Sequence, residues 1–292
     1  MNNKTIIYIA GDGHTGSTLL DIILGSGKKS FSTGELRFLA EKGVVNGEYC
    51  SCGMPVPECT LWKEVIEKWE KVMTLDWDSY IRIQRVLKSN KKIFSARKLL
   101  NRQPEQIKNF IDDTEQLYSI IFSVTGSETI IDSSKAPGMI PILKELKFNL
   151  RVIHLTRRFG DVWNSNKKRA KKDLKKGIEH DIVPKSTLTV LVNWFFINIL
   201  TKYHTKGVEC KHIKYEEYID ELKQTVSDII RVDSEYEALL ENRGPFVPAH
   251  LVAGNAIRRK GEQFVTKKPM NTSYSRLNSA ERVLARTIDW FY

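Results

Sequence analysis

Short apolar runs that end in glycine or polar residues recur along this chain of 292 residues. The first run, residues 6–10, has the length and β-branched content of a buried strand, and apolar residues recur at helical spacing between Ser17 and Gly25. We expect further strands at residues 30–33, 129–131, 152–156 and 210–214. Strands that alternate with helices predict an α/β fold, a three-layer sandwich with a central, mainly parallel sheet.

Other regions show helical periodicity without strands. Residues 62–124 are predicted to form a helical insertion made basic by Lys88, Lys91, Lys92, Arg97, Lys98 and Arg102. Residues 188–200 are apolar but contain Asn193 and Asn198, which favours a buried helix over a membrane span. We expect a loop at residues 245–268, an amphipathic helix at 277–292, and one domain over residues 1–292.

The formal net charge is +11, which predicts an acidic partner. A phosphorylated nucleotide, nucleic acid and an anionic membrane surface all fit that description. The run at residues 6–10 is shorter than the apolar region of a signal peptide, and no segment has the length of a transmembrane helix. We therefore expect a cytoplasmic protein without a transmembrane segment.

The loop between the first predicted strand and helix contains Gly11, Gly13 and Gly16. Glycines at this point let several backbone N–H groups and a helix N-terminus converge, which is typical of a phosphate or sulfate site. The Walker A loop of nucleotide hydrolases requires a lysine before its Ser/Thr, but here Gly16 is followed directly by Ser17 and Thr18. The loop thus predicts an anion site, and the missing lysine disfavours an NTPase with a Walker A loop.

A second strand and helix contain another candidate anion site. The strand predicted at residues 152–156 ends at Arg157, and Ser165 follows eight positions later, about two helical turns on. This spacing lets both side chains face one ligand.

These stretches resemble the sulfotransferases that use 3′-phosphoadenosine 5′-phosphosulfate (PAPS). In that family a loop after the first strand binds the 5′-phosphosulfate, and an arginine and a serine eight residues apart bind the 3′-phosphate. The segment His14-Thr15-Gly16-Ser17-Thr18 is similar to the first motif, and Arg157 with Ser165 to the second. Further similar pieces follow in order: Gly34-Glu35, Asp132-Ser133-Ser134-Lys135, Tyr215-Glu216, Gly254-Asn255 and Arg258-Arg259-Lys260-Gly261.

The resemblance implies a P-loop-like sulfotransferase fold, PAPS as co-substrate, PAP as product and no metal. The implied acceptor is a hydroxyl of a small molecule or glycan, as in the carbohydrate or tyrosylprotein branches. The basic residues of the helical insertion either form a solvated face or recognise an acidic acceptor such as a uronic-acid glycan. By the same resemblance the nucleotide-binding residues are Gly13, His14, Thr15, Gly16, Ser17, Thr18, Arg157, Ser165, Tyr215, Arg258, Arg259, Lys260 and Gly261. Glu35 is the expected general base, and His14 is its rival.

Two residues depart from the family pattern. His14 stands where arginine or lysine is usual, and Gly160 stands where proline is common. The role of Lys135, with the phosphosulfate or with the acceptor, stays open.

Two other functions compete with this prediction. A P-loop kinase fits the glycine loop but lacks the lysine, and among the apolar strands only the one before Asp132 ends in an aspartate. A nucleic-acid-binding protein fits the charge but leaves both anion sites without a purpose. We therefore expect no nucleic-acid partner.

Three of the four cysteines, Cys50, Cys52 and Cys59, fall within ten residues. Their spacing is tighter than the paired sets of zinc ribbons, and no fourth ligand stands nearby in the sequence. We expect a structural role, either as free thiols or with Cys59 in a disulfide, and no metal.

Overall fold

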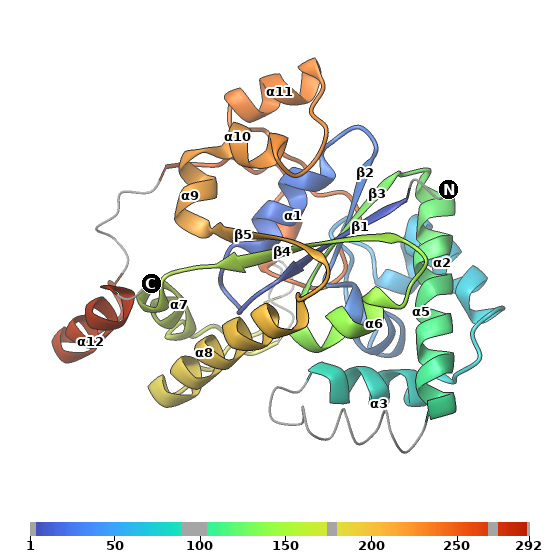
Figure 1. Cartoon of the computed structure of the whole chain (residues 1–292), viewed down its shortest axis with the longest axis horizontal. Helices are drawn as coiled ribbons and strands as arrows, with labels where there is room; N and C mark the ends of the chain where they lie inside the picture. The colour runs from blue at the N-terminus through green and yellow to red at the C-terminus, as the bar shows by residue number, and fades with distance from the viewer. Residues whose placement is uncertain (1–3, 89–103, 174–179, 268–273, 291–292) are drawn as a thin grey trace.

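The computed structural model describes residues 4–88, 104–173, 180–267 and 274–290 (Figure 1). Its centre is a five-stranded sheet in the order β2-β3-β1-β4-β5, in which all neighbouring strands pair in parallel. The strands are β1 Thr5–Ala10, β2 Ser30–Gly34, β3 Thr129–Lys135, β4 Asn149–Thr156 and β5 Glu209–Lys214. All five predicted strands are present, and β3 extends beyond its predicted end through the polar residues up to Lys135.

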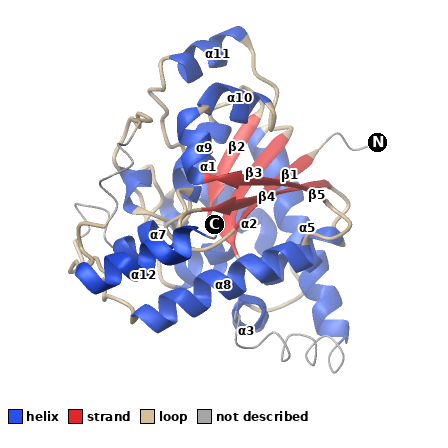
Figure 2. Ribbon diagram, turned by 60° about the vertical axis from the view of Figure 1, so that its left-hand side comes forward, coloured by secondary structure: helices blue, strands red, loops and turns tan. Residues whose placement is uncertain are grey.

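Helices cover both faces of this sheet, as Figures 1 and 2 show. Alternate residues of β1 enter different cores, because successive side chains of a strand point to opposite faces. Ile7 and Ile9 pack with α1 Ser17–Gly25, α9 Tyr215–Asp220, α10 Leu222–Ser227 and α11 Ser234–Glu241. Ile6 and Tyr8 pack with α2 Thr60–Glu70, α3 Trp77–Lys88, α5 Pro104–Thr125 and α6 Ile140–Lys144. The predicted three-layer α/β sandwich is confirmed.

The predicted helical insertion consists of α2, α3 and α5, between β2 and β3. Its core is aromatic: the ring of Tyr80 lies 5.0 Å from that of Trp69 and 4.6 Å from that of Phe110. Helix α3 also packs on the 3₁₀ turn Pro137–Met139, just after β3, and so flanks the carboxyl end of that strand. Lys91, Lys92, Arg97, Lys98 and Arg102 lie outside the described residues, as does the side chain of Lys88.

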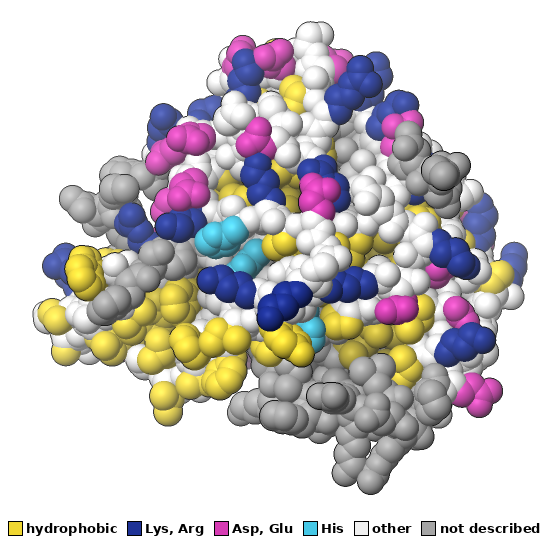
Figure 3. All heavy atoms as spheres, in the orientation of Figure 1, with side chains coloured by type: hydrophobic (Ala, Val, Ile, Leu, Met, Phe, Trp, Pro, Cys, Tyr) yellow, Lys and Arg dark blue, Asp and Glu magenta, His cyan; other side chains and the backbone are white. Residues whose placement is uncertain are grey.

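A smaller apolar cluster joins α7 Phe159–Asn166, α8 Thr187–His204 and α12 Ser279–Trp290. The prediction that α8 is buried is wrong: within this helix only Val190 and Thr201 are buried. Leu188, Phe195 and Phe196 are 70%, 54% and 50% exposed, and apolar side chains gather over α8 in Figure 3. Apolar residues surround this helix on every side, so the sequence does not reveal which side faces solvent.

The segment after α11 runs back to the sheet as an extended loop, in agreement with its prediction. Val252 bridges to Gly34 at the end of β2, and a 3₁₀ turn, Ala256–Arg259, packs against α1. Directly after β2, Glu35 is followed by a 3₁₀ turn, Leu36–Phe38, and a π-helical turn, Leu39–Val45.

In the described part of the chain, no helix combines the length and apolarity that a membrane crossing requires.

The two sides of α8 predict contrasting effects on stability. Val190→Ala removes buried methyl groups and should lower the free energy of unfolding by roughly 2 kcal/mol. Phe195→Ala, on the exposed side, should change it by less than about 0.5 kcal/mol. Urea unfolding of both variants makes the comparison. A larger loss for Phe195→Ala than for Val190→Ala would mean that this side of α8 is covered.

Candidate functional site

The carboxyl ends of the five strands meet along one edge of the sheet. In spatial order this edge presents Glu35 after β2, Lys135 at the end of β3, the glycine loop after β1, Arg157 after β4 and Tyr215 after β5. The chain leaves β1 toward β2 at one edge of the sheet, whereas it leaves the adjacent β4 toward β5 at the other edge, and open α/β sheets bind ligands at such a point. The edge therefore brings together residues from most of the predicted motifs.

The glycine loop is closed by a residue that must be glycine. Gly16 has φ of +87°, and a Cβ added there would lie 2.5 Å from two ring carbons of Tyr215. The phenol of Tyr218 donates a hydrogen bond to the Gly16 carbonyl at 3.3 Å. The loop is thus held against the start of α9, and α1 begins at the next residue.

The glycine loop and the first turn of α1 contain five successive backbone N–H groups, those of residues 14–18. In the described parts of the chain none of these five groups donates to an acceptor, whereas Gly13 N–H is bonded to the Asp12 carboxylate at 2.7 Å. Helix α1 has neither a side-chain cap nor an acidic residue in its first turn. N–H groups of a loop and of a helix N-terminus that lack protein acceptors are available to solvent or to a ligand, and this arrangement is typical of an anion site.

Arg157 reaches across from β4 to this loop. Its guanidinium donates to the His14 carbonyl at 3.0 Å and stacks on Tyr215 with 4.1 Å between Cζ and the ring centroid. The Arg157 Nε lies 3.7 Å from the Asp161 carboxylate. Ser165, one further helical turn along α7, is half-buried and lies on the same side as Asp161. Arg157, Tyr215 and the loop therefore form one contiguous group.

The surroundings of the loop are strongly cationic. Partial desolvation and the nearby Lys135, Lys185, Arg157 and Lys168 lower the pKa of His14 to about 4. His14 is therefore neutral at physiological pH, although it occupies the position where the resembling family has a cation. The neighbouring lysines and arginine supply that positive charge instead.

Glu35 lies in an ion-pair network beside the loop. One carboxylate oxygen is 2.5 Å from the Lys135 ammonium, and the other is 3.0 Å from the Arg37 guanidinium. Burial acts to raise the pKa of Glu35, but Lys135 and then Arg37 outweigh it and hold the pKa below its ordinary value of 4.5. Glu35 is therefore a carboxylate throughout the neutral range.

The polar residues of β3 hold this network in position. Tyr118 of α5 donates to the Asp132 carboxylate at 2.6 Å, and the Ser134 hydroxyl accepts from the Arg37 N–H at 3.0 Å. Burial raises the pKa of Asp132. Lys135 itself has φ of +66°, a region that non-glycine residues adopt uncommonly and mostly where the surroundings enforce it.

The predicted Arg258-Arg259-Lys260-Gly261 motif is divided between the interior and the surface. Arg258 is 2% exposed and donates to the Tyr49 carbonyl at 2.8 Å, while Arg259 stacks over the Tyr49 ring at 4.9 Å. Lys260 and Gly261 are exposed. These contacts join the motif to Tyr49, and its role at the 3′-phosphate stays a prediction.

Gly160 departs from the family pattern for a structural reason. A Cβ there would lie 2.0 Å from the ring of Tyr274, and the Gly160 N–H donates to the Asp289 carboxylate at 3.2 Å. Glycine lets α12 dock against α7, and proline would remove the N–H.

The sequence indicated some of these residues poorly or not at all. Lys135 was left without an assigned role, and Lys185 carried no signal because it is a single lysine before a helix. His250 is the clearest omission: its imidazole lies 3.2 Å from Cys59 Sγ although 191 positions separate the two residues in the chain. No fourth ligand stands near the cysteines in the sequence, but the fold brings His250 next to them.

A shallow depression lies beside Arg37, on the β2 side of the edge. It encloses only about 10 Å³ and is lined by Arg37, Phe38, Glu41, Gln84, Arg85 and Met139. Arg85 of α3 donates to Glu41 at 2.9 Å. The helical insertion thus contributes to the surface next to Arg37.

No protein-family model and no curated protein matches the chain. Among solved structures, the sulfotransferase domain from the curacin biosynthetic pathway has a TM-score of 0.53 and 17% identity, with 97% of each chain covered. The sulfotransferase domain from the Synechococcus PCC 7002 olefin synthase has a TM-score of 0.48 and 18% identity, covering 100% of this chain and 96% of its own. Sulfotransferase STF9 from Mycobacterium avium has a TM-score of 0.46 and 12% identity, with 83% and 68% covered. The first of these likenesses shows that the chain has a sulfotransferase-like fold.

The contact between Gly16 and Tyr215 predicts a steep response to a single methyl group. Gly16→Ala should lower the free energy of unfolding by about 2 to 4 kcal/mol, from the left-handed backbone and the clash together. Gly13→Ala is the matched control, because a Cβ there meets no atom within 4 Å, and it should cost less than about 0.5 kcal/mol. Denaturant unfolding measures both, and equal losses would contradict the loop geometry.

Proposed function

We propose that the protein is a sulfotransferase that moves a sulfonate group from PAPS to an acceptor hydroxyl. The observation that carries this proposal is the group of five unpartnered N–H groups at residues 14–18, flanked by Arg157 on one side and by the Glu35–Lys135 pair on the other. Such an arrangement can bind an anion with a second phosphate beside it and a base opposite. The sulfotransferase-like fold supports the same function.

The nucleotide would lie along the edge from β1 to β5. In this proposal the N–H groups of residues 14–18 bind the 5′-phosphosulfate, and Arg157 with Ser165 binds the 3′-phosphate. Tyr215, already stacked under Arg157, is available to the adenine. Charge-assisted hydrogen bonds of this type are the stronger ones in proteins.

The proposed reaction is an in-line transfer. The acceptor oxygen forms a bond to sulfur while the bond from sulfur to the 5′-phosphate oxygen breaks, and PAP leaves with that electron pair. Glu35 takes the hydroxyl proton, and the N–H groups of the loop stabilise negative charge on the leaving oxygen. Lys135 would exchange its contact with Glu35 for one with the sulfonate oxygens. Since burial would then dominate, this exchange raises the pKa of Glu35 and makes it a stronger base.

The acceptor would approach beside α3, where Arg37 and Arg85 are each paired with a carboxylate. The basic residues of the helical insertion, from Lys88 to Arg102 in the sequence, favour an acidic glycan among the candidate acceptors. A screen of glycans, lipids and peptides with labelled PAPS would identify it.

The proposal predicts selective binding of PAP. At a concentration of a hundred times its Kd, PAP should add about 2.7 kcal/mol to the free energy of unfolding, whereas ATP with Mg²⁺ and an oligonucleotide should add little.

Arg157→Ala should raise the Kd for PAP by about 10-fold to 100-fold through loss of the 3′-phosphate contact. Arg151→Ala is the matched control, since Arg151 belongs to the same strand but pairs with Glu209 near its opposite end.

Thermal shift and titration calorimetry supply these measurements. Equal affinity of the parent and Arg157→Ala for PAP, or stabilisation by ATP with Mg²⁺ in place of PAP, would refute the assignment. Equal binding of adenosine 5′-phosphosulfate with and without its 3′-phosphate would do the same.

The ion pair of Glu35 predicts the pH dependence of the reaction. The carboxylate is the active form, so kcat/KM should be lost only as pH falls through the lowered pKa, below 4.5. Lys135→Met removes the largest charge that lowers this pKa, so the acid limb of the kcat/KM profile of this variant should lie at higher pH.

Glu35→Gln should lower kcat by about 10² to 10⁴-fold through loss of the general base. Glu64→Gln, which changes an exposed carboxylate of α2, should leave kcat unchanged. If Glu35→Gln stays active while His14→Asn is inactive, His14 is the base.

A further inference from the structure

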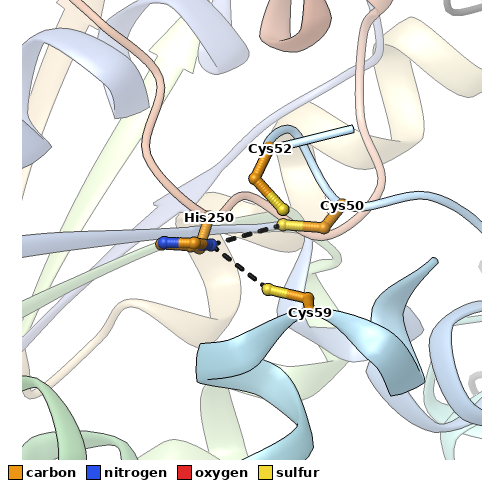
Figure 4. A group of neighbouring side chains, drawn as sticks. All are labelled: Cys50, Cys52, Cys59 and His250. Atoms are coloured by element: carbon orange, nitrogen blue, oxygen red, sulfur yellow. Dashed lines mark hydrogen bonds between the residues drawn. The ribbon is translucent and has the colours of Figure 1, made fainter. Parts of the chain in front are cut away.

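Four side chains from two distant parts of the chain converge on one point below the sheet edge. Cys50 and Cys52 come from a tight turn, Cys59 from the start of α2 and His250 from the extended segment after α11. Their sulfur and nitrogen ligand atoms all lie within 4.8 Å of one another. Figure 4 shows the three sulfurs and the imidazole directed toward a common centre. All four cysteines of the chain are free thiols in the structure.

From this geometry we propose that these residues bind a structural Zn²⁺ ion as a Cys₃His site. Tetrahedral zinc with bonds of about 2.3 Å to sulfur and 2.0 Å to nitrogen holds its ligands about 3.6 to 3.8 Å apart. The His250 Nδ1 lies 3.2 Å from Cys59 Sγ and 3.8 Å from Cys50 Sγ, close to those separations. Three thiolates and an imidazole also match the soft ligands that zinc favours in structural sites.

The number of ligands assigns the ion a structural role. Four protein ligands complete a tetrahedral shell and leave no position for water or substrate, which is the distinction between structural and catalytic zinc. Cys50 and Cys59 are buried, and Trp62 donates to the His250 carbonyl at 2.6 Å, which holds the backbone of this histidine beside α2. Zinc with three thiolates carries a net negative charge, and the buried Arg258 guanidinium, bonded to the carbonyl just before Cys50, supplies positive charge nearby.

The ion would hold together two segments that already exchange hydrogen bonds. The Ser51 N–H donates to the Leu251 carbonyl at 3.1 Å, and the Leu251 N–H donates to the Ser51 hydroxyl at 2.7 Å. The Ser51 hydroxyl also donates to the Ala249 carbonyl at 2.9 Å, so the two segments lie side by side before any metal binds. A metal that binds residues of both segments only when they are folded together stabilises the folded chain by its binding free energy.

The clamped segment leads directly to the candidate active site. Two residues after His250, Val252 accepts from the Glu35 N–H and donates to the Thr33 carbonyl, both at 2.8 Å. The N–H of Asn255 then donates to the Thr18 hydroxyl at 3.3 Å. Zinc would therefore determine the position of Glu35 and of the first turn of α1 from outside the site. The metal site itself does not depend on the proposed function.

Elemental analysis of the full chain tests the proposal. Purified without a polyhistidine tag from zinc-supplemented cells, the protein should contain about one zinc per chain. Cys50→Ser and His250→Ala should lose the metal, whereas Cys210→Ser, which changes the exposed cysteine outside the cluster, should retain it. Chelation should lower the melting temperature by about 10 °C, and added zinc should restore it.

A second measurement covers variants that fail to fold. The chelated wild-type chain should bind one equivalent of Co²⁺ with the near-ultraviolet charge-transfer absorption of a thiolate ligand, and Zn²⁺ should remove that absorption. A chain that contains no zinc and binds no Co²⁺ overturns the proposal. So does a disulfide among Cys50, Cys52 and Cys59 in non-reducing mass spectrometry, or a zinc content that Cys50→Ser leaves unchanged. Since PAP binding is measured separately, loss of one proposal does not decide the other.

Discussion

Five successive N–H groups without a protein acceptor impose the main constraint on this fold. They converge because Gly16 adopts a left-handed conformation against Tyr215, and both neighbours of β1 in the sheet supply cations to the same place. Such a turn is suited to an anion, because N–H groups of the loop and the N-terminus of α1 lie together without protein acceptors. The packing of α9 on the loop and the stacking of Arg157 on Tyr215 are contacts that keep the turn open for a ligand.

The order of strands separates two kinds of chemistry. On the β4 and β5 side of the loop lie Arg157 and Tyr215, a guanidinium and a ring suited to a phosphorylated nucleotide. On the β3 and β2 side lie Lys135 and Glu35, a cation and a carboxylate suited to group transfer. The cysteine and histidine cluster is anchored behind the second pair, where Val252 adds to the end of β2. In the proposed function, nucleotide binding and sulfonate transfer therefore take place on opposite sides of β1.

Much of this arrangement was accessible from the sequence, because local pattern decides it. Buried strands, glycine turns and an arginine at a strand end leave signals that span only a few residues. Other features depend on packing between distant segments. The sequence around Cys50 gives no indication that His250 lies beside it. The apolar sequence of α8 does not indicate that Phe195 faces solvent, and the sequence around Arg258 does not indicate that this arginine is buried. Lys135 was seen, but its role depends on the neighbour that parallel pairing brings beside it.

A crystal structure of the protein with PAP tests the central claim most directly. The account predicts the 5′-phosphate within hydrogen-bond distance of the N–H groups of residues 14–18 and the 3′-phosphate between Arg157 and Ser165. It further predicts the Glu35 carboxylate on the far side of the 5′-phosphate from the adenine. A nucleotide bound in the reverse direction, or at another edge of the sheet, would contradict the account.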